Sequence, residues 1–186
     1  MPARGENGGV PDRHDQDVLE ALVAAAREGD DVAVAALVRR TQDDVRRLCT
    51  VLGSRGEVDD LVQETYLKAF GSLASFRGDA PFRAWLLTIA RRTCADHVRR
   101  RQRERRLLER VQARTTLDRR PERDHSEELL DQLDPDRREA FVLTQLLDLS
   151  YEEAATVLDC PIGTIRSRVS RARADLLAAH ARVAGF

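Results

Sequence analysis

Arginine is the residue type whose chemistry is most informative in this sequence, and it is concentrated in two segments. Nine arginines lie between Arg91 and Arg110, and four lie between Gly163 and Leu177. A guanidinium group can bond a guanine edge bidentately in the major groove, or neutralise a phosphate. The formal net charge of the chain is only −1, but the distribution of charge, not its sum, indicates a nucleic-acid surface. The two segments therefore predict two contacts with nucleic acid.

The second basic segment has the pattern of a helix-turn-helix unit. Ser150 and Glu153 have the spacing of a capping box, which predicts a helix that ends before Pro161. The apolar residues of the next helix predict its buried side: Ile165, Val169, Ala172 and Leu176. The candidate DNA contacts are the polar residues that remain: Thr164, Arg166, Ser167, Arg168, Ser170, Arg171 and Arg173. A solvated basic helix is the alternative, but the capped helix and turn supply the scaffold that presents such a helix to the major groove.

A helix face that is both acidic and apolar is expected between Asp59 and Phe70. Asp60 and Glu64 lie one turn apart, and such a face suits a basic partner helix, because charge steers the approach and apolar contact holds it. The candidate protein contacts are Asp60, Leu61, Gln63, Glu64 and Leu67. As an alternative, Glu57 and Asp59 could complement a helix N-terminus. Asp59, Asp60 and Glu64 could also bind a metal, although no histidine is near them in the sequence.

Aromatic residues are concentrated beside the first basic segment, where five of the eight in the chain fall between Tyr66 and Trp85. A basic groove beside aromatic faces is how single-stranded DNA is held, whereas the alternative is that these rings build a small core. The candidate contacts in this part are Phe76, Arg77, Arg83, Trp85, Arg91, Arg92, Arg99 and Arg100. Asp96 is expected to pair with Arg92 or Arg100 at helical spacing. His97 is expected on a helix face rather than as a ligand.

The elements that must position these residues are helices, because helical spacing of apolar residues runs through nearly the whole sequence and no convincing strand pattern occurs. Glycine and proline interrupt this spacing between Gly71 and Pro81, and Asp134 followed by Pro135 predicts a capped helix start. The prediction is an all-α fold of two small helical domains. Their expected limits are residues 15–102 and 127–184, with a disordered tail over 1–14 and a flexible linker over 103–126.

The cysteines and the motif content exclude several classes of function. Cys49, Cys94 and Cys160 are odd in number and form no CxxC motif, which argues against a disulfide framework and a zinc site. Cys94 and Cys160 are expected to be small core residues. No apolar run approaches the roughly 18 residues that span a bilayer, and no nucleophile motif or phosphate-binding glycine loop is evident. The sequence therefore predicts a cytoplasmic protein without catalysis, small-molecule substrate, cofactor, metal or membrane insertion.

Three segments resemble the extracytoplasmic-function (ECF) sigma factors of bacterial RNA polymerase, group IV of the primary-sigma-like family. LSYEEAATVLDCPIGTIRSRVSRARADLL, residues 149–177, is similar to region 4 of that family. DDLVQETYLKAF, residues 59–70, is similar to region 2.2, and FRGDAPFRAWLLTIARRTCADHVRRRQR, residues 76–103, to regions 2.3 and 2.4. The resemblance extends over both expected domains in the family's order.

The resemblance implies a transcription initiation factor with three kinds of contact. The face around Asp60 and Glu64 would dock on the clamp of core RNA polymerase. The aromatic and basic residues from Phe76 to Arg100 would hold a flipped base and contact the −10 element of promoter DNA, and the last helix would read the −35 element. An anti-sigma factor is implied as a further partner, and the linker would run through the polymerase. Arg92 stands where many family members have asparagine, so no −10 base preference is carried over.

Two other classes of function fit the helical pattern. A dimeric helix-turn-helix regulator that acts without polymerase would leave the surface of Asp60, Gln63 and Glu64 unexplained. A helical adaptor that binds only protein would not need Arg166 and Arg171. The discriminating observation is whether the purified chain lets core polymerase start transcription from a promoter.

Overall fold

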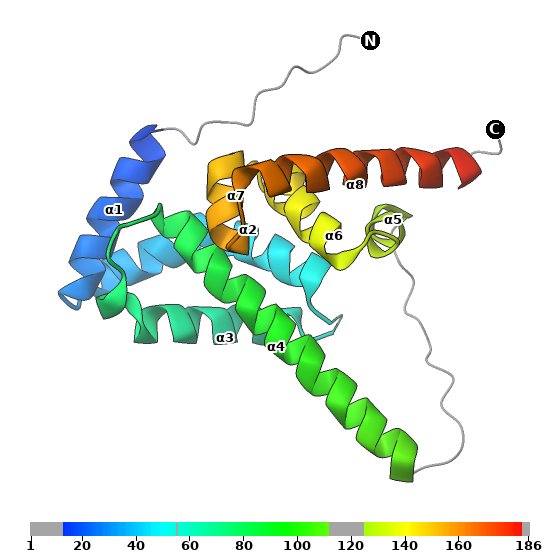
Figure 1. The fold of residues 1–186 in the computed structure, drawn as a ribbon. Coiled ribbons are helices and arrows are strands. Elements are labelled where there is room, and N and C mark those ends of the chain that lie inside the picture. The colour runs from blue at the N-terminus through cyan, green and yellow to red at the C-terminus, as the bar shows by residue number, and fades with distance from the viewer. Residues whose placement is uncertain (1–12, 55, 112–124, 184–186) are drawn as a thin grey trace.

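The structure is a computed structural model of the chain, and it describes residues 13–54, 56–111 and 125–183. Its elements in chain order are α1 (Arg13–Arg27), α2 (Asp31–Leu52), α3 (Val58–Gly71), η1 (Leu73–Ser75), α4 (Phe82–Val111), α5 (His125–Asp131), α6 (Pro135–Phe141), η2 (Val142–Leu146), α7 (Tyr151–Leu158) and α8 (Ile162–Val183) (Figure 1). No strand occurs within these three ranges, and the all-α prediction is confirmed. The predicted tail up to residue 12 and residues 112–124 of the predicted linker lie outside the described part of the chain.

The first four helices, α1 to α4, form what we call the N-terminal unit, in which α2 packs against the other three. Helix α2 begins after Asp30, whose carboxylate accepts hydrogen bonds from two backbone N–H groups of the first turn. The helically spaced residues Leu37, Thr41, Val45 and Leu48 of this helix are buried, with exposed fractions of 0–2%. The spacing of apolar residues therefore identifies the core side of α2 correctly.

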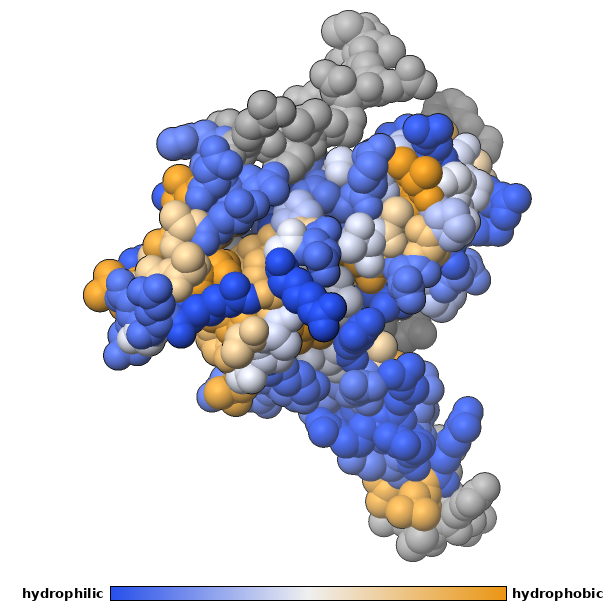
Figure 2. Space-filling model, turned by 60° about the vertical axis from the view of Figure 1, so that its left-hand side comes forward, coloured by the Kyte–Doolittle hydropathy of each residue, from blue (hydrophilic) through white to orange (hydrophobic). Residues whose placement is uncertain are grey.

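Helix α4 is 30 residues long, and its last part projects from the N-terminal unit (Figure 1). Arginine, glutamine, glutamate and leucine are strong helix formers, so the helix continues through Val111, nine residues into the predicted linker. Figure 2 shows the projection as a hydrophilic surface that ends in an apolar patch, where Leu107 and Leu108 are 63% and 59% exposed. The domain limits stay a prediction.

Helices α5 to α8 form the C-terminal unit, which contains the predicted helix-turn-helix. Asp134 caps α6 through the backbone N–H of Asp136, and Pro135 occupies the first position. At the start of α7, the Glu153 N–H donates to the Ser150 hydroxyl at 3.1 Å and the Ser150 N–H donates to the Glu153 carboxylate at 2.9 Å. Both predicted caps are therefore confirmed. The left-handed φ of 50° at Asp159 ends α7 and turns the chain into α8.

Replacing Ser150 with alanine is expected to lower the free energy of unfolding by about 1 kcal/mol, because the Glu153 N–H loses its acceptor. Glu153 is only 7% exposed, so water replaces that acceptor poorly. The control is Thr156→Ala in the same helix, since Thr156 is exposed and its hydroxyl bonds only a carbonyl of the preceding turn. Urea denaturation followed by circular dichroism measures both variants, and equal losses would contradict the capping role.

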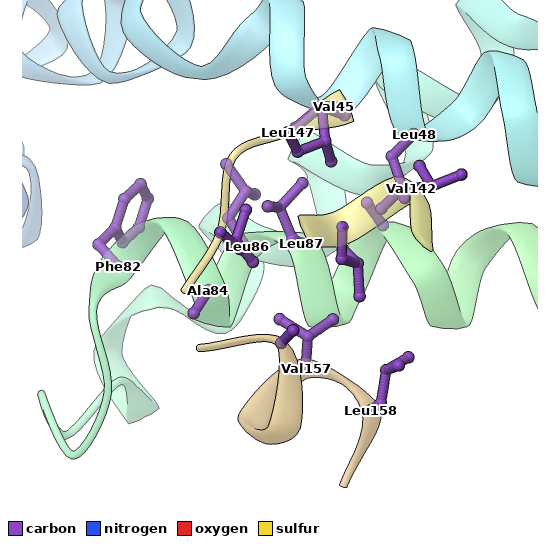
Figure 3. Packing of buried hydrophobic residues seen from close by; sticks show 14 of the residues in the cluster. Val45, Leu48, Phe82, Ala84, Leu86, Leu87, Val142, Leu147, Val157 and Leu158 are labelled. Carbon is purple, nitrogen blue, oxygen red and sulfur yellow. The ribbon is translucent and has the colours of Figure 1, made fainter. Parts of the chain in front are cut away.

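The two units pack against each other, and their buried residues form one continuous hydrophobic cluster. The single π-helical turn η2 contacts α2, while α7 contacts α4. Figure 3 shows Val142 of η2 beside Leu48 of α2, and Leu147 beside Val45. The sequence indicated two domains but not this contact, because spacing within a helix identifies a buried side and not the element that buries it.

Candidate nucleic-acid interface

Helix α8 carries a basic and polar face that is open to solvent. Its apolar side is buried against α6 and α7 as predicted at Ile165, Val169 and Ala172, which are at most 1% exposed. Leu176, predicted on the same side, is only half-buried. Thr164 at the start of the helix is half-buried. Five of the predicted DNA contacts are exposed: Arg166, Ser167, Ser170, Arg171 and Arg173. The first four are called the recognition face here, since Arg173 bonds Gln145 of η2. Because α8 is held by its opposite side, this face can enter a DNA groove without rearrangement of the helix.

Two arginines predicted as DNA contacts on α8 bond to other parts of the C-terminal unit. Arg168 pairs with Asp136 at the start of α6 and donates from Nη1 to Sγ of Cys160 at 3.7 Å. Arg173 donates from Nη2 to Oε1 of Gln145 at 2.7 Å. Arg168, a quarter exposed, therefore holds α8 against α6. The recognition face is smaller than the sequence predicted.

The aromatic residues near the start of α4 form a packed cluster. The ring centroid of Phe76 lies 5.8 Å from that of Phe82 and 5.1 Å from that of Trp85. Phe76 and Phe82 are 7% and 2% exposed, whereas Trp85 is half-buried. The core interpretation therefore holds for Phe76 and Phe82, and Trp85 keeps an open side. Arg77, in the loop before α4, is exposed.

Sequence reasoning missed Arg27, which completes this cluster from the end of α1. Its guanidinium carbon lies 5.7 Å from the ring centroid of Phe76, and its Nε donates to the carbonyl oxygen of Leu73 at 3.1 Å. A cation over an aromatic face is attracted by the ring quadrupole. Arg27 and Leu73 are 46 residues apart in the chain, so no local spacing could have indicated this contact.

Two arginines of α4 that were predicted as DNA contacts are engaged inside the protein. Arg83 donates from Nε to Oδ2 of Asp44 on α2 at 2.6 Å, and from Nη2 to the carbonyl oxygen of Leu147 at 2.6 Å. Arg91 donates from Nε to Oε2 of Glu139 on α6 at 2.8 Å. Leu147 and Glu139 belong to the C-terminal unit, so both arginines join the two units in this structure.

The remaining predicted arginines of α4, Arg92, Arg99 and Arg100, are exposed. The prediction that Asp96 pairs with Arg92 or Arg100 is wrong, because Asp96 accepts from Arg99 at 2.5 Å. Residues three and four positions apart are both neighbours on a helix surface, so spacing alone does not choose between Arg99 and Arg100. The hydrogen bond from Arg99 lowers the pKa of the Asp96 carboxyl.

His97 lies on a helix face as predicted, and its side chain is buried. Its Nε2 contacts the carboxylate of Glu57, while Arg100 contacts its Nδ1 at 3.2 Å. Arg101 pairs with the other carboxylate oxygen of Glu57 at 3.2 Å. Through these contacts with Glu57, His97 and Arg101 connect α4 to the residue that precedes α3.

The acidic and apolar face predicted on α3 is largely open. Asp60, Gln63 and Leu67 are exposed, and Leu67 reaches 67%. Glu64 lies on the same side and pairs with Lys68, one turn later, at 2.7 Å. The four residues Asp60, Gln63, Glu64 and Leu67 are called the docking face below.

Leu61 does not belong to the docking face, although the sequence placed it there. It is 1% exposed and lies in the core of the N-terminal unit. There it packs against Gly53, where an added Cβ would come within 2.4 Å of Cδ1 of Leu61. One residue along a helix turns a side chain by about 100°, which carries Leu61 inward while Asp60 stays outside.

Two of the three cysteines meet in the core of the N-terminal unit. The Sγ atoms of Cys49 on α2 and Cys94 on α4 lie 3.7 Å apart, and both residues are buried. The hydrogen bond between them lowers the pKa of the Cys49 thiol and raises the pKa of the Cys94 thiol. Cys94 is therefore the predicted small core residue, whereas Cys160 is only half-buried.

The described ranges hold neither a metal-binding cluster nor a membrane-spanning helix. No three His, Cys, Asp or Glu side chains gather there in a group that could hold a metal ion, and Asp59 instead pairs with Arg46 at 2.6 Å. Within the same ranges, no helix combines the length and the apolar character needed to cross a membrane.

Family models and relatives match the chain over both units. A model of Sigma-70 region 2 matches residues 37–104, and a model of Sigma-70, region 4 matches residues 127–176. The ECF RNA polymerase sigma factor SigC of Mycobacterium tuberculosis is 43% identical over 178 residues, which cover 88% of this chain and 92% of SigC. The ECF RNA polymerase sigma-E factor of Escherichia coli is 36% identical over 171 residues, which cover 83% and 90% of the two chains.

Two solved structures of similar fold support the same assignment. CnrH, in complex with the cytosolic domain of CnrY, matches with a TM-score of 0.69 and 33% identity over 87% of this chain and 96% of that chain. The sigma factor RpoE, in complex with the anti-sigma factor NepR from Bartonella quintana, matches with a TM-score of 0.64 and 34% identity over 75% and 91%. The relatives span both the unit with the docking face and the unit with the recognition face, and the chain belongs to the ECF RNA polymerase sigma factors.

Proposed function

We propose that this sigma factor binds core RNA polymerase through its N-terminal unit and directs the enzyme to promoters through DNA contacts of both units. The observation that carries the proposal is that one chain presents two exposed faces of different chemistry. The docking face on α3 is acidic and apolar, and the recognition face on α8 is basic and polar. A protein that joins a basic protein surface to DNA needs one face of each kind.

The recognition face reads the −35 element from the major groove in this proposal. Arg166 and Arg171 can bond guanine edges or neutralise phosphates, and Ser167 and Ser170 can reach bases or phosphate oxygens. Arg168 acts as a positioning residue, because its ion pair with Asp136 fixes α8 on its scaffold.

The N-terminal unit binds the −10 element and aids strand separation. The open side of Trp85 offers stacking to an extruded base, and Arg77 lies in the adjoining loop. Arg92, Arg99 and Arg100 contact the DNA backbone, where each neutralised phosphate releases counterions. Binding free energy drives the separation of the strands, so the proposed function needs no catalytic residue, cofactor or small-molecule substrate.

Core polymerase is the proposed partner of the docking face, with the clamp as the site of contact. An anti-sigma factor is a further proposed partner, by analogy with the NepR complex of RpoE. The cytoplasm is the proposed location, because the polymerase and the chromosome are there. A dimeric regulator that acts without polymerase is not favoured, because it leaves the docking face and the family match of the N-terminal unit unexplained.

Replacing Arg166 with alanine tests the reading of the −35 element. The variant is expected to lose about 1–3 kcal/mol of binding to a promoter duplex if the contact to guanine is bidentate. Transcript starts that appear on overexpression of the chain identify the promoter to be used. Fluorescence anisotropy with duplexes altered one base pair at a time should show relaxed specificity at a single −35 position.

Arg182→Ala is the matched control, because Arg182 is an exposed arginine on the same helix outside the recognition face. It should leave the base preference unchanged. Unchanged affinity and footprint of Arg166→Ala would refute the assignment of Arg166. Failure of the wild-type chain to support transcription by core polymerase would refute the proposed function itself.

A further inference from the structure

We propose that Cys49 of α2 and Cys94 of α4 form an oxidation site in the core of the N-terminal unit, where a small hydroperoxide converts the two thiols to a disulfide. The disulfide joins α2 to α4 covalently. The inference does not depend on the proposed function, because it concerns only contacts inside the N-terminal unit. It uses two of the three cysteines of the chain, and neither belongs to the docking face or the recognition face.

The packing of α2 against α4 brings the two sulfur atoms together. Cys49 follows Val45 by one helical turn, and Cys94 follows Ala90 by one turn, so each cysteine shares a buried side with that residue. All four residues are at most 1% exposed. The Sγ atoms of the cysteines are 3.7 Å apart. A disulfide needs a separation of about 2.05 Å, so the two sulfurs must approach each other by only about 1.7 Å.

The two thiols differ in acidity, which gives them different roles. The Cys94 thiol donates to Sγ of Cys49, and this hydrogen bond lowers the pKa of the Cys49 thiol. Burial acts in the opposite direction, whereas Thr65 and the positive charge of Arg46 lower the pKa further. The same hydrogen bond raises the pKa of the Cys94 thiol, and burial raises it too. Because the thiolate is the form that attacks a peroxide, Cys49 is the attacking residue and Cys94 the resolving one.

The oxidation balances in two steps. The Cys49 thiolate attacks one oxygen of hydrogen peroxide, the O–O bond breaks, and the other oxygen leaves as hydroxide, which takes up the proton that Cys49 released. Cys94 then attacks the sulfur of the Cys49 sulfenic acid, the S–O bond breaks, and the thiol proton of Cys94 leaves with the hydroxyl group as water. The two thiols lose two electrons and two protons, and the peroxide is reduced to two molecules of water.

Burial of the pair favours a small oxidant. Neither cysteine is more than 1% exposed, so a reagent reaches the sulfurs only when the helices open locally. Hydrogen peroxide needs a smaller opening than glutathione disulfide, which must place one of its own sulfur atoms against Sγ of Cys49. The third cysteine, Cys160, is half-buried beside Arg168 in the C-terminal unit. It provides a comparison within the same chain.

A covalent link between α2 and α4 stabilises the N-terminal unit. Cys49 and Cys94 are 45 residues apart in the chain, and a disulfide that closes a long loop restricts the unfolded chain strongly. The enclosed segment contains α3, which packs against both α2 and α4 and carries the docking face. Oxidation therefore holds the unit with the docking face in its folded form under conditions that oxidise thiols.

Peroxide treatment of the folded, full-length chain tests the pair. The reduced chain is incubated with hydrogen peroxide in native buffer, quenched with catalase, alkylated and digested with trypsin without reduction. Mass spectrometry is expected to find peptide 48–55 linked to peptide 93–99, with two hydrogen atoms fewer than the separate peptides. Circular dichroism should show that the oxidised chain unfolds at a temperature at least about 5 °C higher than the reduced chain. Dithiothreitol should reverse both changes.

Cys94→Ala and Cys160→Ser are the matched variants. Cys94→Ala lacks one sulfur of the pair and should give neither the linked peptide nor the temperature shift, whereas Cys160→Ser should give both. Glutathione disulfide at the same concentration should leave Cys49 of the native chain unmodified. The comparison of the oxidised and the reduced parent chain needs no variant, so the test does not depend on the folding of Cys94→Ala.

Several results would overturn the proposal. The link between peptides 48–55 and 93–99 could be absent, could form only in urea, or could form without raising the unfolding temperature. A link from Cys49 or Cys94 to Cys160, or a glutathione adduct on Cys49 of the native chain, would count equally against it. None of these measurements contains DNA or polymerase, so the proposed function stands or falls separately.

Discussion

Replacing Leu67 with lysine is expected to weaken binding of the chain to core RNA polymerase by about 2–4 kcal/mol, which is at least about thirtyfold in the dissociation constant. Leu67 is the apolar centre of the docking face and is 67% exposed. A lysine there removes the apolar contact and sets a positive charge against a basic partner surface. Leucine and lysine have similar helix propensities, so the fold of α3 should not suffer.

Val32→Lys is the matched control for this prediction. Val32 is a second exposed apolar residue of the N-terminal unit, at 73%, but it lies at the start of α2 outside the docking face. The control makes the same change of charge and polarity and should keep the affinity of the parent chain. The dissociation constant of each variant is measured by titrating it onto core polymerase that is immobilised on a surface. If both variants lose affinity equally, the docking face is not where the polymerase binds.

Replacing Leu87 with alanine is expected to lower the free energy of unfolding of the whole chain by about 2–5 kcal/mol, the usual cost of a large buried cavity. Leu87 is 1% exposed and stands on α4 among side chains from α2, η2 and α7 (Figure 3). Because the cluster is continuous across both units, the loss should appear in one cooperative transition. Two independent domains would show the loss in only one of two transitions.

Two spectroscopic probes of the same denaturation distinguish one cooperative transition from two separate ones. The chain has a single tryptophan, Trp85, so its fluorescence reports the N-terminal unit, whereas far-ultraviolet circular dichroism reports the helices of both units. Coincident curves that shift together are expected for Leu87→Ala. Leu107→Ala on the same helix is the control, since Leu107 is 63% exposed and its truncation should change stability by less than about 0.5 kcal/mol. Separate transitions in the parent chain would show that the contact between the two units contributes little to the free energy of unfolding.

The contact between the two units also changes how the arginines of this sigma factor are understood. Arg83 and Arg91 were predicted as DNA contacts because they lie in a basic segment beside aromatic residues. In this structure the same groups bond Leu147 and Glu139 of the C-terminal unit. Arg92, Arg99 and Arg100 are exposed in the same structure, as the proposed phosphate contacts need to be.

The sequence by itself determined the local structure and the family. Helical spacing of apolar residues identified the buried sides of α2 and α8. The capping residues Asp134 and Ser150 indicated where α6 and α7 begin. These features depend on contacts between residues that lie within one or two helical turns of each other. Such short-range contacts can be deduced from the spacing of residue types in the sequence. The same periodicity indicated the exposed side of α8, because the polar residues of an amphipathic helix lie opposite its apolar stripe. It did not indicate that Arg168 and Arg173 bond to other parts of the C-terminal unit.

Only the tertiary structure decided which exposed groups are free and which are engaged. Arg83 meets Leu147 across 64 residues of chain, Arg91 meets Glu139 across 48, and Arg27 meets Leu73 across 46. Leu61 packs closely against Gly53, in the loop before α3, where a Cβ would come within 2.4 Å of its Cδ1. Such contacts arise when whole helices pack, and packing depends on the shapes of both partners. The periodicity of a helix indicates which of its sides is buried. It does not indicate which other element packs against that side.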